Sequence, residues 1–407
     1  MLLAVALDAQ VRDTTEVLEA LAEQQVLVTQ TLGGGYEVDY ADAGEGAFER
    51  TRPQLAALGP IVRLQVANDP VLKHLRLDGL RDVERLTIAG NAGLRSIGGL
   101  DDLGNLQELV IEDNDRLKEI EAFDSLAELR TLEIVGNYRL RVLPDLGPLE
   151  RLRSLEIVAN ERLAGLTGLH GLAALEQLEL RDNGRIAELA MHNALANLRS
   201  LSIYYNPKLA KITGLDGSPE LRRLVLYGNS ALKTMPDLSA LRELRSLEVT
   251  NNGRLETLAG LESLANLQRL VITRNRNLQS LAGLEGLGGL QSLVIFGNNR
   301  LTSVFGVAGL DQLRLLVVWD NALLTQIAGL EDLPSLERAA VAGSVVEELI
   351  DAFQRTPELQ TLVLDDAVEP RRVGVALNQM RRDAGLAPVD ISHSSPGSPA
   401  WWEAMRG

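Results

Sequence analysis

The chain has 407 residues, no cysteine and a formal net charge of −16. Without cysteine it cannot form disulfides, thiolate zinc sites or a cysteine nucleophile. The acidic balance argues against a nucleic-acid partner, because phosphate recognition needs clustered lysine and arginine. Apolar residues make up 45 % of the chain and aromatic residues only 3 %, so a large core is available and leucine must fill it.

The N-terminal segment, residues 1–58, does not repeat. Asp13 and Glu16 have the spacing of a capping box and predict the start of a helix. Open solenoid ends need caps, so this segment is predicted to be an N-terminal cap, with a small partner-binding module as the alternative. The other expected elements are a strand at 25–31, a glycine turn at 33–35, a return strand at 36–40 and a helix at 46–58.

The next part of the chain repeats with a fixed period of 23 residues. No residue is inserted or lost over this stretch, and a strict period of this length predicts a solenoid with one coil per repeat. Asp69 takes the asparagine position before the first repeat, 22 residues earlier. The recurring residue is asparagine, at Asn91, Asn114, Asn137, Asn160, Asn183, Asn206, Asn229, Asn252, Asn275, Asn298 and Asn321.

Apolar residues fall at fixed places around each asparagine. Two of them, five and three residues before it, alternate as in a short strand with one buried face. The others are spaced by three, which predicts tight turns or 3₁₀ coil. One complete set is Leu163, Leu166, Leu169, Leu172, Leu175, Leu178 and Leu180.

The repeat resembles that of the leucine-rich-repeat superfamily, whose signature is present as Leu152, Leu155, Ile157 and Asn160. The next leucine follows the asparagine by three residues rather than the common two, as in a short bacterial or receptor L-domain variant. The resemblance implies an α/β solenoid over residues 59–343. This is a right-handed coil with a long parallel sheet on its concave face, short turns or 3₁₀ segments on its convex face, and helical caps.

Two constant residues have assignable tasks. The asparagine side chain carries two donors and an acceptor, and is expected to satisfy backbone groups of its own turn and the next. A glycine eight residues after it, such as Gly99 or Gly168, is expected to permit a bend that a side chain would oppose.

The pattern fades after residue 343. Residues 344–391 are predicted to form a C-terminal cap, and residues 392–407, rich in serine, proline and glycine, a flexible tail. Trp401 and Trp402 in this tail either fold back on the cap or form a docking peptide. The expected cap elements are a helix at 345–354, a strand at 359–364, a helix at 370–384 and a strand at 389–391.

The sequence contains no catalytic constellation. His74, His170, His192 and His393 lie in different repeats without metal-ligand spacing, and neither a phosphate-binding lysine loop nor a nucleophile elbow is present. His192 occupies a leucine position, which indicates a loosened coil. We therefore predict that the protein is not an enzyme and binds no metal or cofactor.

No stretch is long enough to span a membrane. The apolar start, residues 1–7, is short and lacks a basic flank, so it is a poor signal peptide. A cytoplasmic location is predicted, with a secreted protein whose leader has been removed as the alternative.

Side chains two, four and six residues before each asparagine should point outward from the sheet, in rows. The row at minus two holds four aromatic residues where chance gives about 0.4. Large apolar patches mark interaction sites, but β-propensity alone also favours such residues on sheet faces. The predicted ligand-binding patch is Tyr204, Tyr205, Val225, Tyr227, Val271, Val294, Phe296, Val317 and Trp319.

Glu133, Glu156 and Glu179 form an acidic row on the same face. Arg181 lies beside this row and is expected to pair with acidic groups of a ligand. This row is interpreted either as a solvated face that limits aggregation or as a shelf that orients a basic segment of a partner. The predicted function is therefore a scaffold that binds a protein or peptide on its concave sheet. The alternatives are a secreted or surface adhesin for a host protein or glycan, an enzyme that uses the non-repeating ends, and a spacer without ligand.

Overall fold

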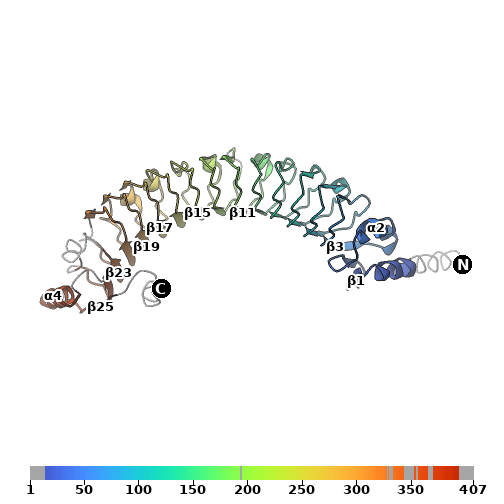
Figure 1. Ribbon diagram of the computed structural model, residues 1–407. Helices are drawn as coiled ribbons and strands as arrows, with labels where there is room; N and C mark the ends of the chain where they lie inside the picture. The colour runs from blue at the N-terminus through green and yellow to red at the C-terminus, as the bar shows by residue number, and fades with distance from the viewer. Residues whose placement is uncertain are drawn as a thin grey trace. The chain divides into compact units, whose positions relative to one another are not determined.

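The computed structural model describes residues 14–192, 195–327, 329, 333–342, 353, 356–364 and 370–393. The chain forms two compact units, Met1–Leu198 and Arg199–Gly407. Each unit is a solenoid in which every coil contributes one strand to a parallel sheet (Figure 1). The predicted fold class, an α/β solenoid with a long parallel sheet, is confirmed.

The first unit begins with its non-repeating part. Residues 14–23 are helical, β1 (Leu27–Gln30) pairs antiparallel with β2 (Tyr36–Asp39), and α2 (Ala47–Leu58) follows. β2 also pairs in parallel with β3, so the hairpin extends the sheet of the coils. The expected hairpin and second helix are therefore confirmed, and Pro53 lies inside α2 without ending it.

The sheet of the first unit continues through consecutive parallel strands, with 3₁₀ turns and short strands on the other side of the coils. The main strands are β3 (Ile61–Ala67), β5 (Arg85–Ala89), β7 (Glu108–Glu112), β9 (Thr131–Val135), β10 (Ser154–Val158) and β11 (Gln177–Arg181). The smaller elements are β4 (His74–Arg76), β6 (Ser96–Gly98), η1 (Leu100–Asp102), β8 (Glu119–Ile120), η2 (Leu169–Gly171) and β12 (Glu188–Ala190).

The second unit repeats this arrangement. Its main strands are β13 (Ser200–Tyr204), β15 (Arg223–Tyr227), β16 (Ser246–Thr250), β17 (Arg269–Thr273), β19 (Ser292–Phe296), β21 (Leu315–Trp319), β23 (Arg338–Val341), β24 (Thr361–Leu364) and β25 (Asp390–His393). The smaller elements are β14 (Lys211–Thr213), η3 (Leu215–Gly217), η4 (Leu261–Ser263), β18 (Ser280–Leu281), η5 (Leu284–Gly286), β20 (Ser303–Val304), β22 (Gln326–Ile327) and α4 (Pro370–Asp383).

The core lies inside the coils, where leucine and isoleucine side chains are almost entirely buried. In β7, Leu109 and Ile111 point inward, while Val110 and Glu112 are half-buried on the outer face. This alternation follows from the two-residue period of a strand and confirms which positions face inward. It also leaves every second side chain of each strand on one shared outer surface.

The asparagines form a buried hydrogen-bonded ladder. Asn137 donates its amide to the carbonyls of Ile111 at 2.8 Å and Val135 at 2.9 Å. Its side-chain oxygen accepts from the backbone N–H of Asn114 at 3.3 Å. The partners belong to its own coil and the preceding one, whereas the sequence interpretation assigned them to its own coil and the next. The asparagine side chain therefore links buried backbone groups of neighbouring coils.

Asp69 shows why the first coil carries a carboxylate instead of an amide. It accepts the backbone N–H of Gly46 at 2.9 Å, of Val71 at 3.1 Å and of Leu72 at 3.2 Å. All three partners are donors, so a side chain with acceptors only is suited to this place. The Gly46 contact ties the turn before α2 to the first coil.

The far end follows the expected elements in the part of the chain that the structure describes. A strand, helix α4 and the final strand β25 occur close to the predicted ranges, and β25 extends the sheet beyond β24. The predicted helix at 345–354, of which only residue 353 is described, and the tryptophan pair of the tail lie outside the described residues. The boundaries of caps, array and tail stay predictions.

Candidate binding surface on the sheet

The outward side chains of the second unit form straight rows, because neighbouring strands pair in register. Tyr204 pairs with Tyr227, which pairs with Thr250 on the next strand. The same row continues through Thr273 and Phe296 to Trp319. The predicted alignment of outward side chains on a single surface is thus confirmed within this unit.

At one end of this row, the rings of Tyr204 and Tyr205 both contact the ring of Tyr227. The ring centroids of Tyr205 and Tyr227 lie 4.9 Å apart at 65°, and those of Tyr204 and Tyr227 lie 6.2 Å apart at 46°. Tyr205 is 45 % exposed, whereas Tyr204 and Tyr227 are half-buried. We call Tyr204, Tyr205 and Tyr227 the tyrosine cluster. It presents rigid aromatic surface with hydroxyl groups, a combination that is frequent in binding hot spots.

Tyr205 adopts a left-handed backbone conformation with φ of 50°. Side chains with a Cβ are disfavoured there, and in four other coils the equivalent residue is glycine. The next such glycine, Gly228, has no room for a side chain, because an added Cβ would lie 2.6 Å from Cδ1 of Tyr205. The tyrosine ring thus lies against a glycine of the following coil.

The middle of the face combines apolar and polar groups. Val271, Val294 and Phe296 are half-buried. The guanidinium carbon of Arg274 lies 5.7 Å from the ring centroid of Phe296, within cation–π range. Thr250 and Thr273 join their hydroxyls at 2.8 Å. This part of the patch is accessible only in part.

Three predicted patch residues are buried, contrary to the exposure expected from sequence. Val225 and Val317 are 1 % exposed and Trp319 is 2 % exposed. Val317 and Trp319 pack with Ala340 of β23 and Val363 of β24, so the apolar rows extend past the repeats and form a cluster of their own. These three side chains offer almost no accessible surface in this arrangement. Their part in binding stays a prediction.

The acidic row of the first unit is also in register. Glu133, Glu156 and Glu179 pair directly on β9, β10 and β11. Burial, and then repulsion by Glu156, raises the pKa of Glu133. Burial also raises the pKa of Glu179, against the opposing effect of Arg181.

Arg181 is engaged within this acidic row. It lies 3.5 Å from Glu179 and 3.9 Å from Glu156. The sequence interpretation had this arginine pairing with acidic groups of a ligand. Its guanidinium instead offsets repulsion between carboxylates of the row.

The histidines show no catalytic arrangement. His170 and His192 come within 6.3 Å, ring centroid to ring centroid, at 87°. His192 has a left-handed backbone with φ of 51°, and the loosened coil expected there stays a prediction. Among the described residues, no three histidine or carboxylate side chains are placed to hold a metal ion.

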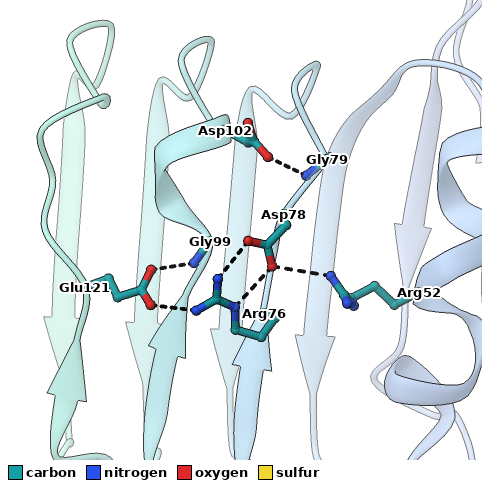
Figure 2. Close-up of polar contacts among 7 residues, drawn as sticks. All are labelled: Arg52, Arg76, Asp78, Gly79, Gly99, Asp102 and Glu121. Atoms are coloured by element: carbon teal, nitrogen blue, oxygen red, sulfur yellow. Dashed lines mark hydrogen bonds and ion pairs between the residues drawn. The ribbon is translucent and has the colours of Figure 1, made fainter.

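A second charged cluster, on the turns of the first unit, has perturbed pKa values but a structural explanation (Figure 2). Arg76 lies between Asp78, at 2.8 Å, and Glu121, at 2.7 Å. The hydrogen bond from Arg76 lowers the pKa of Asp78. Glu121 also accepts the N–H of Gly99 at 2.7 Å, where the backbone is left-handed with φ of 75°. These contacts satisfy the turn backbone and leave no open site.

No family model matches the chain, and no curated protein matches it in sequence. Solved structures do match. A leucine-rich-repeat protein of Leptospira interrogans is 18 % identical, with 83 % of this chain and 86 % of that chain covered and a TM-score of 0.52. Toll, in the Toll–Spatzle complex of Drosophila, is 20 % identical over 84 % of this chain and 45 % of that chain, with a TM-score of 0.57.

The repeat signature, the asparagine ladder and these structures define the class of protein. The chain has the leucine-rich-repeat fold. No helix among the described residues is long and apolar enough to cross a bilayer.

Proposed function

We propose that the second unit binds a protein or peptide on the outer face of its sheet, with the tyrosine cluster as the anchor. The observation that carries this proposal is Tyr205, which keeps a disfavoured backbone conformation and an exposed ring. Strained residues of this kind concentrate at functional sites. A purely structural role would be met at lower cost by the glycine found in other coils.

The surroundings of the cluster define the chemistry of the partner. Half-buried Val271, Val294 and Phe296 offer apolar surface along the same face. Arg223 and Arg269 are exposed on the neighbouring row. A segment with an apolar or aromatic side chain and a nearby carboxylate would match both features.

The fold supports a binding role by analogy only. The Toll structure was solved in complex with Spatzle, and it shares the fold of this chain. The surface-adhesin alternative, the cytoplasmic location and the absence of enzymatic activity stay predictions. So does an orienting role for the acidic row of the first unit.

The test compares two variants against a partner captured with the full chain and identified by mass spectrometry. Tyr205→Ala with Tyr227→Ala should weaken binding by about tenfold or more, as expected for truncated hot-spot residues. Phe305→Ala is the matched control, because Phe305 is 42 % exposed but follows β20, which belongs to a separate small sheet and not to the proposed binding face. Equal affinities of the tyrosine-cluster variant and wild-type protein would refute the proposal.

A further inference from the structure

A row of cations follows the asparagine turns of the first unit, away from the sheet face. Six exposed residues, five of them arginine, line two adjoining surface grooves of about 340 and 240 Å³. Glu119 is a further lining residue of the larger groove. We call these six residues the cationic groove: Arg95, Arg116, Lys118, Arg139, Arg141 and Arg162.

The cations form two rows because they occupy two positions of the repeat. Arg116, Arg139 and Arg162 come two residues after successive asparagines. Arg95, Lys118 and Arg141 come four residues after theirs. Backbone bonds hold the second row, since the N–H of Lys118 donates to the carbonyl of Arg95 at 2.9 Å.

No ion pair or hydrogen bond joins any of these six side chains to another residue within the part of the chain that the structure describes. Like charges on neighbouring coils repel, so the arrangement does not stabilise the fold. The second of these two positions does not require a cation for the coil to form. At the second position, the coils of the second unit carry Ala210, Lys233, Glu256, Gln279, Thr302 and Thr325.

From these observations we propose that the cationic groove binds an acidic peptide segment of a partner protein. Arginine matches carboxylates with two parallel hydrogen bonds. Coils lie about 4.8 Å apart, so the four coils that carry these residues span roughly 14 Å, which about five extended residues cover. Exposed Tyr138 and Val142 lie next in sequence to Arg139 and Arg141 and add apolar surface for a peptide side chain.

A nucleic acid is the less suitable occupant. The chain carries a net charge of −16, which repels a dense polyanion at long range. Glu119 in the groove lining would face phosphates unfavourably but can accept an N–H of a peptide. A short acidic segment carries fewer charges than a nucleic acid, so the net charge of the chain and Glu119 oppose its binding less.

The experiment measures binding of a fluorescent oligoglutamate peptide with one central leucine to the full chain. The same peptide with glutamine in place of glutamate is the neutral probe, and an oligothymidylate of equal charge is the nucleic-acid probe. We expect the oligoglutamate to bind at low salt, more weakly as salt rises, and more tightly than either other probe.

Variants locate the site. Arg116→Gln, Arg139→Gln and Arg162→Gln together should weaken oligoglutamate binding about tenfold or more. The control replaces Lys208, Arg254 and Arg300, which hold the same repeat position in the second unit, with glutamine. It removes equal charge and should change affinity less than about twofold. Tyr205→Ala with Tyr227→Ala should leave this binding intact, which separates it from the proposed function.

Three results would overturn the proposal. The first is that the oligoglutamate does not bind at low salt. The second is that the groove variant and the control variant lose the same amount of affinity. The third is that the oligothymidylate binds more tightly than the oligoglutamate, through the same three arginines. The circular dichroism spectrum of each variant should match that of wild-type protein, which would show that the replacements do not unfold the coil.

Discussion

The ring of Tyr205 packs edge-on against Tyr227, with centroids 4.9 Å apart, although the two residues belong to different coils. Tyr227 is the strand residue of its coil, whereas Tyr205 follows β13 in a left-handed conformation. The turn therefore directs the side chain of Tyr205 toward the next coil. Contact with the neighbouring ring stabilises Tyr205 in a backbone conformation that is disfavoured for residues with a side chain.

Replacement of Tyr205 should separate the contribution of the ring contact from that of the backbone strain. Tyr205→Ala loses a ring contact of about 0.5–1.5 kcal/mol and keeps the strain. Tyr205→Gly loses the same contact but relieves about 1 kcal/mol of strain. Urea unfolding should therefore rank the glycine variant above the alanine variant by about 1 kcal/mol. Equal midpoints would mean that the turn stores no strain.

The asparagine ladder makes a second prediction. Asn137→Ala leaves the carbonyl of Ile111 and the N–H of Asn114 without their side-chain partner, both in a buried place. Each unsatisfied group costs about 1–3 kcal/mol, so a loss of about 2–6 kcal/mol is expected for the two groups. Hydrogen exchange should show the loss concentrated in the coils on either side of residue 137. Replacement of an exposed residue such as Arg162 provides the control for stability and should change it by less than about 0.5 kcal/mol.

The sequence determined the coil, the register and the ladder, because all three depend on periodicity. A residue 23 places further on must pair with its predecessor, as Tyr204 does with Tyr227. The burial of Trp319 could not be predicted, since it depends on Ala340 and Val363, which lie where the repeat has faded. The repeat period predicts the face on which a side chain lies, but not which residues outside the repeats pack over it.

The left-handed position before each asparagine was missed, although the sequence contained a signal. That column holds glycine, aspartate or asparagine in most coils, for example Gly136, Asp182 and Asn251. These residue types tolerate positive φ. Ala159, Tyr205 and Arg274 depart from this preference. The cationic groove was missed for another reason. Only the negative net charge of the whole chain was considered, and not the local excess of arginine on a few coils.

Arg381 in α4 gives a third prediction. It is fully buried and donates to the carbonyls of Ala387 at 2.8 Å, Phe353 at 2.9 Å and Thr356 at 2.8 Å. Arg381→Leu would leave these acceptors unpaired, and Arg381→Lys offers only one nitrogen for several distant carbonyls. Both should destabilise the end of the second unit by about 3 kcal/mol or more. Limited proteolysis should then cut near α4 first. Replacement of Arg382, which is exposed on the same helix, should not produce this early cleavage.

The acidic row predicts an unusual pH dependence. Burial and the neighbouring Glu156 raise the pKa of Glu133 above its ordinary value. The folded protein then holds this proton more tightly than the unfolded chain. The resulting contribution to stability is fully present below the ordinary carboxyl pKa, near about 4.3, and is lost as pH rises through the raised pKa.

Glu133→Gln removes both the charge and its titration. The variant should unfold at a higher urea concentration than wild-type protein at neutral pH, and this advantage should shrink as the pH falls through the carboxyl range. Glu161→Gln, on an exposed turn, serves as the control that should show no such pH-dependent gain. Stability curves of wild type and Glu133→Gln that stay parallel from neutral to acid pH would contradict this account. Parallel curves would show that repulsion between the carboxylates of the row does not lower the free energy of unfolding. Water and salt would then screen these charges in the folded protein as they do in the unfolded chain.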